Sequence, residues 1–222
     1  SQKISKHFHL KPKSIFITMI LLLLITTAKI SLDVYLGVQN IKISKNYLTK
    51  GDFVSSKKKA QSAQKNFKTA HGEFAFFTSP VSLIIPKKIK GVSQALKSAS
   101  FASAALADFS EGAKLLSINL TAVVSPENKK QTITSQEYSS LFAKATFEAS
   151  FAFELARSAQ NAGILNNLLQ KHGYNIKQLS QVSQISYELT NLINDITATN
   201  TKKSYLILIE NNNELRPGGG FI

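Results

Sequence analysis

Residues 52–77 of the chain read DFVSSKKKAQSAQKNFKTAHGEFAFF, and their spacing predicts a long amphipathic helix. After the first heptad the apolar residues recur every three or four positions, which places them on one helix face. Asp52 stands where an N-cap is expected. The stripe consists of Phe53, Ala60, Ala63, Phe67, Ala70, Phe74 and Phe77, and the opposite face carries Lys57, Lys58, Lys59, Lys65 and Lys68.

The same period returns in three later segments, at about residues 88–120, 135–169 and 176–198. Alanine and serine dominate the first two of these segments, so neighbouring helices can approach closely. The apolar stripe of the last segment consists of Leu179, Val182, Ile185, Leu189, Leu192 and Ile196. Amphipathic helices joined by short linkers most simply form an antiparallel bundle, which we expect over residues 37–200.

Polar linkers are expected at residues 78–87, 121–134 and 170–175. Ser79-Pro80 should end the first of these helices, because the residue before a proline disfavours helical geometry. Gly163 is expected to kink or end the third helix, and His172-Gly173 to stop it.

The amino end has the pattern of a membrane anchor. Residues 1–13 form a basic tail without acids, and residues 14–28 read SIFITMILLLLITTA without a charge. These fifteen residues make about 22 Å of helix, so we expect the span to be completed by 29–36. The basic tail favours a cytoplasmic amino terminus. A cleaved signal peptide and a buried core helix are the alternatives.

Composition excludes several classes of site. The 222 residues include 27 basic and 13 acidic side chains, for a net charge of +14, four histidines and no cysteine. Thiol chemistry and cysteine-bound metals are therefore excluded, and we expect no metal or cofactor. Lysine supplies nearly all the positive charge, which disfavours specific nucleic-acid reading and favours anionic lipids or cell-wall polymers as partners. Compositional drift in an AT-rich genome is the alternative explanation.

No catalytic constellation stands out between residues 36 and 200. Asp108 and Glu111 share a helix face, and Glu148 and Glu154 do so loosely, which is common on solvated surfaces. His71 is expected to be exposed, without a second histidine at metal-binding spacing. The phenylalanines of residues 142–153 are expected to pack in the core.

The carboxyl end differs in character from the helical part. Residues 205–210 form a short apolar run that predicts a buried strand, and the sequence stops soon after a second apolar run begins. We therefore expect residues 201–222 to open a truncated, sheet-containing α/β domain, which would be a partner of the bundle. Arg216 with Gly218, Gly219 and Gly220 could bind an anion, because glycines let backbone amides approach closely. A structural turn is the alternative.

The segment YLILIENNNELRPGGGFI resembles the opening motif of a bacterial family called domain of unknown function 4012. Gly218 stands where that family usually has threonine. The resemblance covers about 18 of the 222 residues and implies a membrane-anchored, extracytoplasmic bacterial protein without an established activity. The matching residues are Asn211, Asn212, Glu214, Leu215, Arg216, Pro217, Gly219, Gly220, Phe221 and Ile222.

Two main functions follow from these features. The first is a non-catalytic, membrane-anchored helical stalk or scaffold of the cell envelope, with Lys57, Lys58, Lys59, Lys65 and Lys68 facing lipid. The second rests on a remoter similarity to LytR-CpsA-Psr enzymes, which implies a glycopolymer transferase that holds polyprenyl-pyrophosphate through Arg216 and the glycines. A periplasmic sensor is a third hypothesis, although no second membrane span is evident in residues 37–222.

Overall fold

The computed structural model describes residues 12–79, 85–124, 135–163 and 166–197, and within these ranges the chain is mainly helical. The predicted helical fold class is confirmed, whereas the strand expected after residue 204 lies outside the described residues. The described elements are α1 (Pro12–Thr49), α2 (Phe53–Thr78), α3 (Pro86–Val124), α4 (Ser135–Asn161) and α5 (Asn166–Thr197).

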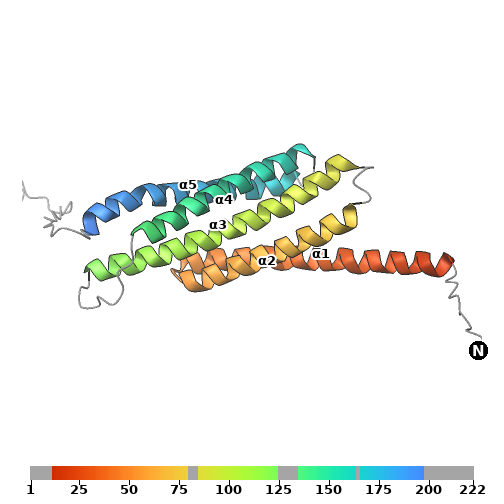
Figure 1. Cartoon of the computed structure of the whole chain (residues 1–222), viewed down its shortest axis with the longest axis horizontal. Coiled ribbons are helices and arrows are strands. Elements are labelled where there is room, and N and C mark those ends of the chain that lie inside the picture. Colours follow the sequence, from red (N-terminus) through yellow and green to blue (C-terminus); the bar gives the residue numbers. More distant parts are fainter. Residues whose placement is uncertain (1–11, 80–84, 125–134, 164–165, 198–222) are drawn as a thin grey trace, which may run out of the picture.

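The helices form an elongated antiparallel array in which each packs against the next (Figure 1). The order of contacts is α1 on α2, α2 on α3, α3 on α4 and α4 on α5, with a smaller contact between α3 and α5. Helix α3 is therefore central, and residues 103–107 of it are buried on every side. The amino-terminal part of α1 projects beyond α2, past one end of the array (Figure 1).

The main difference from the sequence prediction concerns α1. We expected an anchor over residues 14–36 and the first bundle helix at Asp52, but one helix runs from Pro12 to Thr49. Its carboxyl half packs on α2 and belongs to the bundle. Gly51, at φ 76°, makes the turn that follows. The predicted N-cap is confirmed, because the Ser55 N–H donates to Asp52 Oδ1 at 3.0 Å.

Small side chains hold the first three helices close together. The predicted stripe of α2 is buried at Ala60, Ala63, Phe67 and Ala70. A Cβ added to Gly37 of α1 would lie 2.7 Å from Phe67 Cζ, so the Phe67 ring occupies space that a larger residue at 37 would fill. Ile30 and other partly buried residues of α1 and α3 complete this cluster.

Buried serines connect the same three helices. The Ser44 hydroxyl of α1 donates to the Ser56 carbonyl at 2.8 Å, and the Ser56 and Ser110 hydroxyls lie 2.8 Å apart. Ser110 donates to the Leu106 carbonyl of its own helix at 2.7 Å. All three serines are fully buried, and their mutual bonds offset the cost of removing hydroxyls from water.

The boundary between the last two helices also differs from the prediction. We placed a helix stop at His172-Gly173, but α4 ends at Asn161 and α5 runs from Asn166 through that position. Gly163 adopts φ 75°, and its N–H donates to the Gln160 carbonyl at 2.9 Å. Of the two glycine signals, the one at 163 ends the helix, because the backbone takes a left-handed conformation at Gly163, whereas Gly173 lies within α5.

We expected the apolar stripe of α5 to face the bundle, but it does not. Ser183 and Thr190 are buried instead, and Leu179 is partly buried. The remaining described members of the stripe are exposed on the outer side of the helix, namely Val182, Ile185, Leu189 and Leu192.

Candidate functional site

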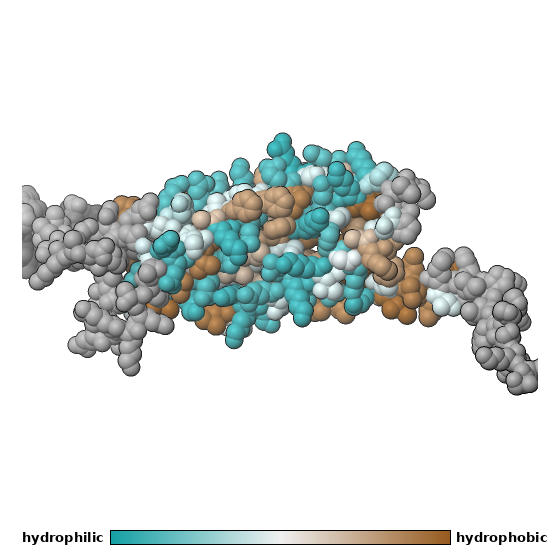
Figure 2. All heavy atoms as spheres, viewed as in Figure 1, coloured by the Kyte–Doolittle hydropathy of each residue, from teal (hydrophilic) through white to brown (hydrophobic). Residues whose placement is uncertain are grey.

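The projecting part of α1 presents hydrophobic side chains to its surroundings. The described residues hold one helical stretch long and apolar enough to cross a membrane, Ile20–Thr49, whose most apolar 18-residue window has a mean hydropathy of 1.7. Only 6% of its most apolar window is buried, which argues against the core-helix alternative. Figure 2 shows hydrophobic atoms in brown where α1 leaves the bundle. The large hydrophobic residues exposed on this arm are Ile17, Ile20, Leu21, Leu22, Leu23, Leu24 and Ile25.

The arm begins where α2 ends. Lys29 of α1 forms an ion pair with Glu73 of α2, five residues before α2 ends at Thr78, so this pair marks a level just inside the bundle. Before Lys29, residues 12–28 make about 25 Å of helix that projects beyond that level. After Lys29, α1 continues for twenty residues to Thr49, which is about 30 Å along the bundle. One rigid element therefore joins the apolar arm to the core.

We call the end of the bundle beside the arm the anchor-side end. It is formed by the last turn of α2, the first turns of α3 and the end of α4 (Figure 1). Phe76 is 75% exposed there and contacts Phe77 edge to face, with ring centroids 5.2 Å apart. Ile85 is exposed close by in sequence, just before α3.

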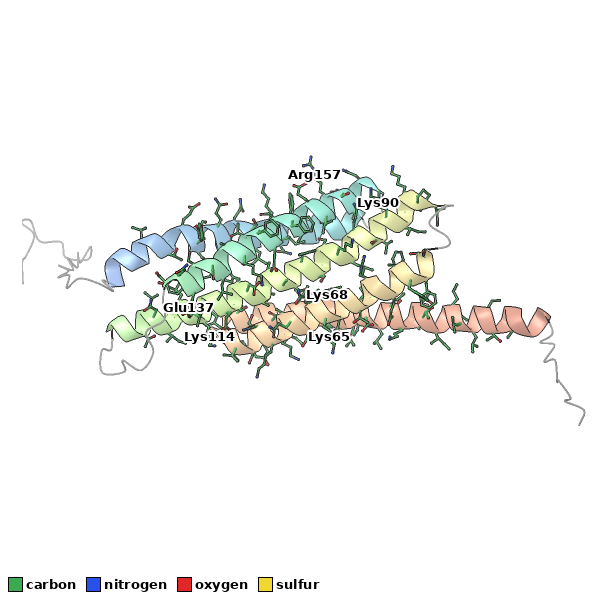
Figure 3. All side chains as sticks on the ribbon, in the orientation of Figure 1. Lys65, Lys68, Lys90, Lys114, Glu137 and Arg157 are labelled. Carbon is green, nitrogen blue, oxygen red and sulfur yellow. The ribbon has the colours of Figure 1, made fainter. Side chains whose placement is uncertain are left out.

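Cations accompany these apolar groups. Lys87, Lys88 and Lys90 are exposed on the first turns of α3. Figure 3 shows Lys90 on α3 and Arg157 on α4 toward the same end of the bundle. Exposed aromatic and aliphatic side chains beside lysines are the composition that suits a membrane interface with anionic headgroups.

The lysines that we predicted as a lipid contact lie elsewhere. Lys65 and Lys68 project from the side of α2, away from its ends (Figure 3). They are exposed, as is Lys58, whereas Lys59 is partly buried. Lys57 forms an ion pair with Glu111 of α3, at 3.1 Å. Counting along α2 from Glu73, Lys68 lies about 7 Å and Lys58 about 22 Å toward the far end.

The acids that we assigned to solvated surfaces are mostly enclosed by ion pairs. Glu111 contacts both Lys57 and Lys114, the latter at 3.3 Å. Burial alone would raise the pKa of Glu111, but the bonds from Lys57 and Lys114 outweigh it and hold the pKa below its ordinary value. The Lys57–Glu111 pair joins α2 to α3, the Lys114–Glu111 pair lies within α3, and both have the geometry of structural contacts.

A second cluster joins α3 to α4. Lys144 lies 2.8 Å from Asp108 and 4.0 Å from Glu148. Burial raises the pKa of Glu148 to about 7, the Asp108 charge adds to the effect, and Lys144 opposes it. Glu148 Oε2 is buried with no hydrogen-bond partner among the described residues. The carboxyl group is therefore poised to take up a proton near neutral pH, and the sequence carried no signal of it.

His71 is half-buried, in contrast to our expectation of an exposed ring. Its Nε2 lies 2.9 Å from the Ser93 hydroxyl of α3. Burial lowers the pKa of His71, and the positive charge of Lys97 lowers it further. The residue thus ties α2 to α3. Within the described ranges, no group of histidine, aspartate and glutamate side chains could hold a metal ion.

The remaining predicted site cannot be placed. Arg216, Gly218, Gly219 and Gly220 lie outside the described residues. A scan against protein-family models, a search of curated proteins and a search of solved structures each found no match to the chain. The features of the described residues that bear on function are the arm, the anchor-side end and the charged clusters.

Proposed function

We propose that this chain is a membrane-anchored helical stalk, a scaffold module of a bacterial cell-envelope protein. The observation that carries the proposal is the continuity of α1. Its apolar arm stands free of the bundle, while the rest of the same helix is packed into the core. A tether built this way has no hinge between membrane and bundle, since no loop separates them.

The direction of the helices supports a spacer role. α1, α3 and α5 run away from the arm, and α2 and α4 return toward it (Figure 1). Helix α5 therefore ends at the far end of the bundle, and whatever follows it starts about 30 Å or more from the level of Lys29. The stalk would hold that following part at a set height above the bilayer.

The lipid contact is proposed for the anchor-side end, next to the arm. Electrostatic attraction to anionic lipids falls off within a Debye length, about 8 Å at physiological salt. Lys58 and Lys65 lie farther than this along α2 if α1 stands upright, whereas Lys87 and Lys88 lie at the end itself. The basic amino-terminal tail favours a cytoplasmic amino terminus and an extracytoplasmic bundle.

Nothing among the described residues favours the glycopolymer transferase over the stalk. That hypothesis depends on residues 201–222 and the resemblance of their motif. It predicts that polyprenyl-pyrophosphate binds the complete protein and that Arg216→Ala abolishes this binding.

Site-specific labelling tests the proposed anchorage, because the chain contains no cysteine of its own. Single-cysteine variants Ile20→Cys, Phe76→Cys and Val54→Cys would carry an environment-sensitive dye in phosphatidylglycerol-containing vesicles. We expect nitroxide lipids to quench the dye strongly at 20, partly at 76 and hardly at 54, near the far end. A water-exposed dye at position 20 would reject the anchor. Equal quenching at 54 and 76 would reject an upright stalk.

A further inference from the structure

Helix α5 buries its polar side and exposes its apolar side, which is the reverse of an ordinary bundle helix. Its packed side carries small polar residues, with Ser183 and Thr190 buried and the Ser180 hydroxyl 2.7 Å from that of Ser150 on α4. Its outer side carries four large aliphatic residues that are 45–57% exposed. We call this set the α5 stripe, and it consists of Val182, Ile185, Leu189 and Leu192.

The stripe has the spacing of a helix-pairing surface. Its members follow one another at intervals of three, four and three residues, which matches heptad positions a, d, a and d. Such a seam faces a second helix and interlocks with it. Val182 and Ile185 also line an open surface depression with Gln178, Gln181, Gln184 and Glu188, which can receive side chains from a partner.

Charge distinguishes between the partners that could cover the stripe. The chain carries +14 overall, yet residues 178–197 contain two acids and no lysine or arginine. The polar residues beside the stripe are mainly glutamines. Two copies of the chain can therefore meet at α5 without bringing lysines together, although like charges would repel them over most of their surface.

We propose that the α5 stripe binds the α5 stripe of a second copy of this chain, with the two helices parallel. The parallel direction rests on the proposed membrane anchorage. Two copies whose arms enter one bilayer in the same orientation are related by a twofold axis along the membrane normal. Each α5 then runs in the same direction, and each stripe residue meets its own counterpart across the axis.

Disulfide crosslinking of the full chain in vesicles tests the pairing. Leu189→Cys places a thiol within the stripe, and Tyr187→Cys places one at an exposed position of the same helix that belongs neither to the stripe nor to the depression beside it. Under mild oxidation we expect Leu189→Cys to form covalent dimers at least tenfold faster than Tyr187→Cys. Equal rates for the two variants would overturn the proposal.

Mixtures of variants test the direction and the occupant. If Val182→Cys crosslinks to Leu192→Cys faster than either crosslinks to itself, the helices are antiparallel and the proposal is wrong. If Leu189→Cys stays monomeric and is protected from maleimide, something other than a second copy covers the stripe, such as residues 198–222, and the proposal is also wrong.

Energy transfer between labelled copies provides a second measurement without crosslinks. The double variant Val182→Ser, Leu189→Ser should lower transfer in vesicles at least fivefold and keep its helical circular dichroism, because both side chains are exposed. Unchanged transfer would count against the stripe. Carbonate extraction of the same vesicles separates this inference from the proposed function. If the chain stays in the membrane but does not pair, only the proposed α5 interface is wrong. If carbonate extracts the chain from the membrane, the proposed anchor is wrong.

Discussion

At the scale of single residues, the bundle depends on small and polar side chains in buried positions. The hydroxyls of Ser44, Ser56 and Ser110 link three helices through bonds that each contribute roughly 1 kcal/mol. Gly112 of α3 is another such position, since an added Cβ would lie 2.9 Å from Phe142 Cε1. Close helix packing here comes from residues that occupy little volume.

Glu148 gives the molecule a measurable pH dependence. Its pKa is raised from 4.5 to about 7 in the folded chain. Between these two pH values Glu148 is protonated in the folded chain and ionised in the unfolded chain. Stability should therefore fall as the pH rises through this window and level off above it. We expect a loss of about 1–2 kcal/mol, less than the full shift implies because solvent reaches part of the carboxyl group.

The variant Glu148→Gln should remove this slope and stabilise the chain at pH 8 by about 1 kcal/mol, since the amide needs no buried charge. Thermal unfolding of the full chain in detergent micelles at pH 5 to 8 measures both effects. Glu154→Gln, an exposed position on the same helix, should keep the parent slope. A slope that survives in Glu148→Gln would assign the pH dependence to another group.

At the scale of helices, element boundaries are set by backbone geometry at a few positions. Gly163 separates α4 from α5 with φ 75°, and Gly51 separates α1 from α2 with φ 76°. Residues with a Cβ adopt this left-handed conformation at a cost of roughly 1–2 kcal/mol. By contrast, Gly72 lies inside α2 with nothing near its missing Cβ.

Alanine at these two kinds of glycine should act in opposite directions. Gly163→Ala is expected to destabilise the chain by about 1 kcal/mol, because the new Cβ strains the turn. Gly72→Ala should stabilise it by about 0.5–1 kcal/mol through helix propensity. Urea unfolding followed by circular dichroism measures both shifts. Stabilisation by Gly163→Ala would mean that the helix does not end there.

At the scale of the whole molecule, the proposed lipid contact depends on where each charge lies relative to the arm rather than on the net charge of +14. Exposed lysines occur both on the side of α2 and on α3 at the anchor-side end, namely Lys58, Lys65 and Lys68 on α2 and Lys87, Lys88 and Lys90 on α3. Only the second group lies beside the point where the arm leaves the bundle. The ion pairs of Lys57 and Lys144 hold helices together and remove those two lysines from any free basic surface.

Two triple variants with the same change of net charge test this distinction. The first is Lys87→Gln, Lys88→Gln, Lys90→Gln, and the second is Lys58→Gln, Lys65→Gln, Lys68→Gln. With the dye at Phe76→Cys in phosphatidylglycerol vesicles, the first should lower lipid quenching by about half and abolish its salt dependence. The second should behave as the parent protein. Equal losses in both would place the side of α2 against lipid.

The amino-acid sequence by itself determined the helical class, the apolar arm, the buried face of α2 and the N-cap at Asp52. These features follow from local rules, because helix periodicity and capping depend on residues within a few positions of one another. The same local rules do not distinguish Gly163 from Gly173 as the end of a helix, since both glycines carry the same local signal.

Only the tertiary structure decided the continuity of α1 into the bundle, the outward direction of the α5 stripe and the proton affinity of Glu148. Whether an apolar stripe is buried depends on the competing surfaces that other helices offer. Here the closely spaced serines and alanines of α3 and α4 leave room for the small polar side of α5 rather than for its aliphatic side. The pKa of Glu148 likewise depends on Asp108 and Lys144, and Asp108 is forty residues away along the chain on α3.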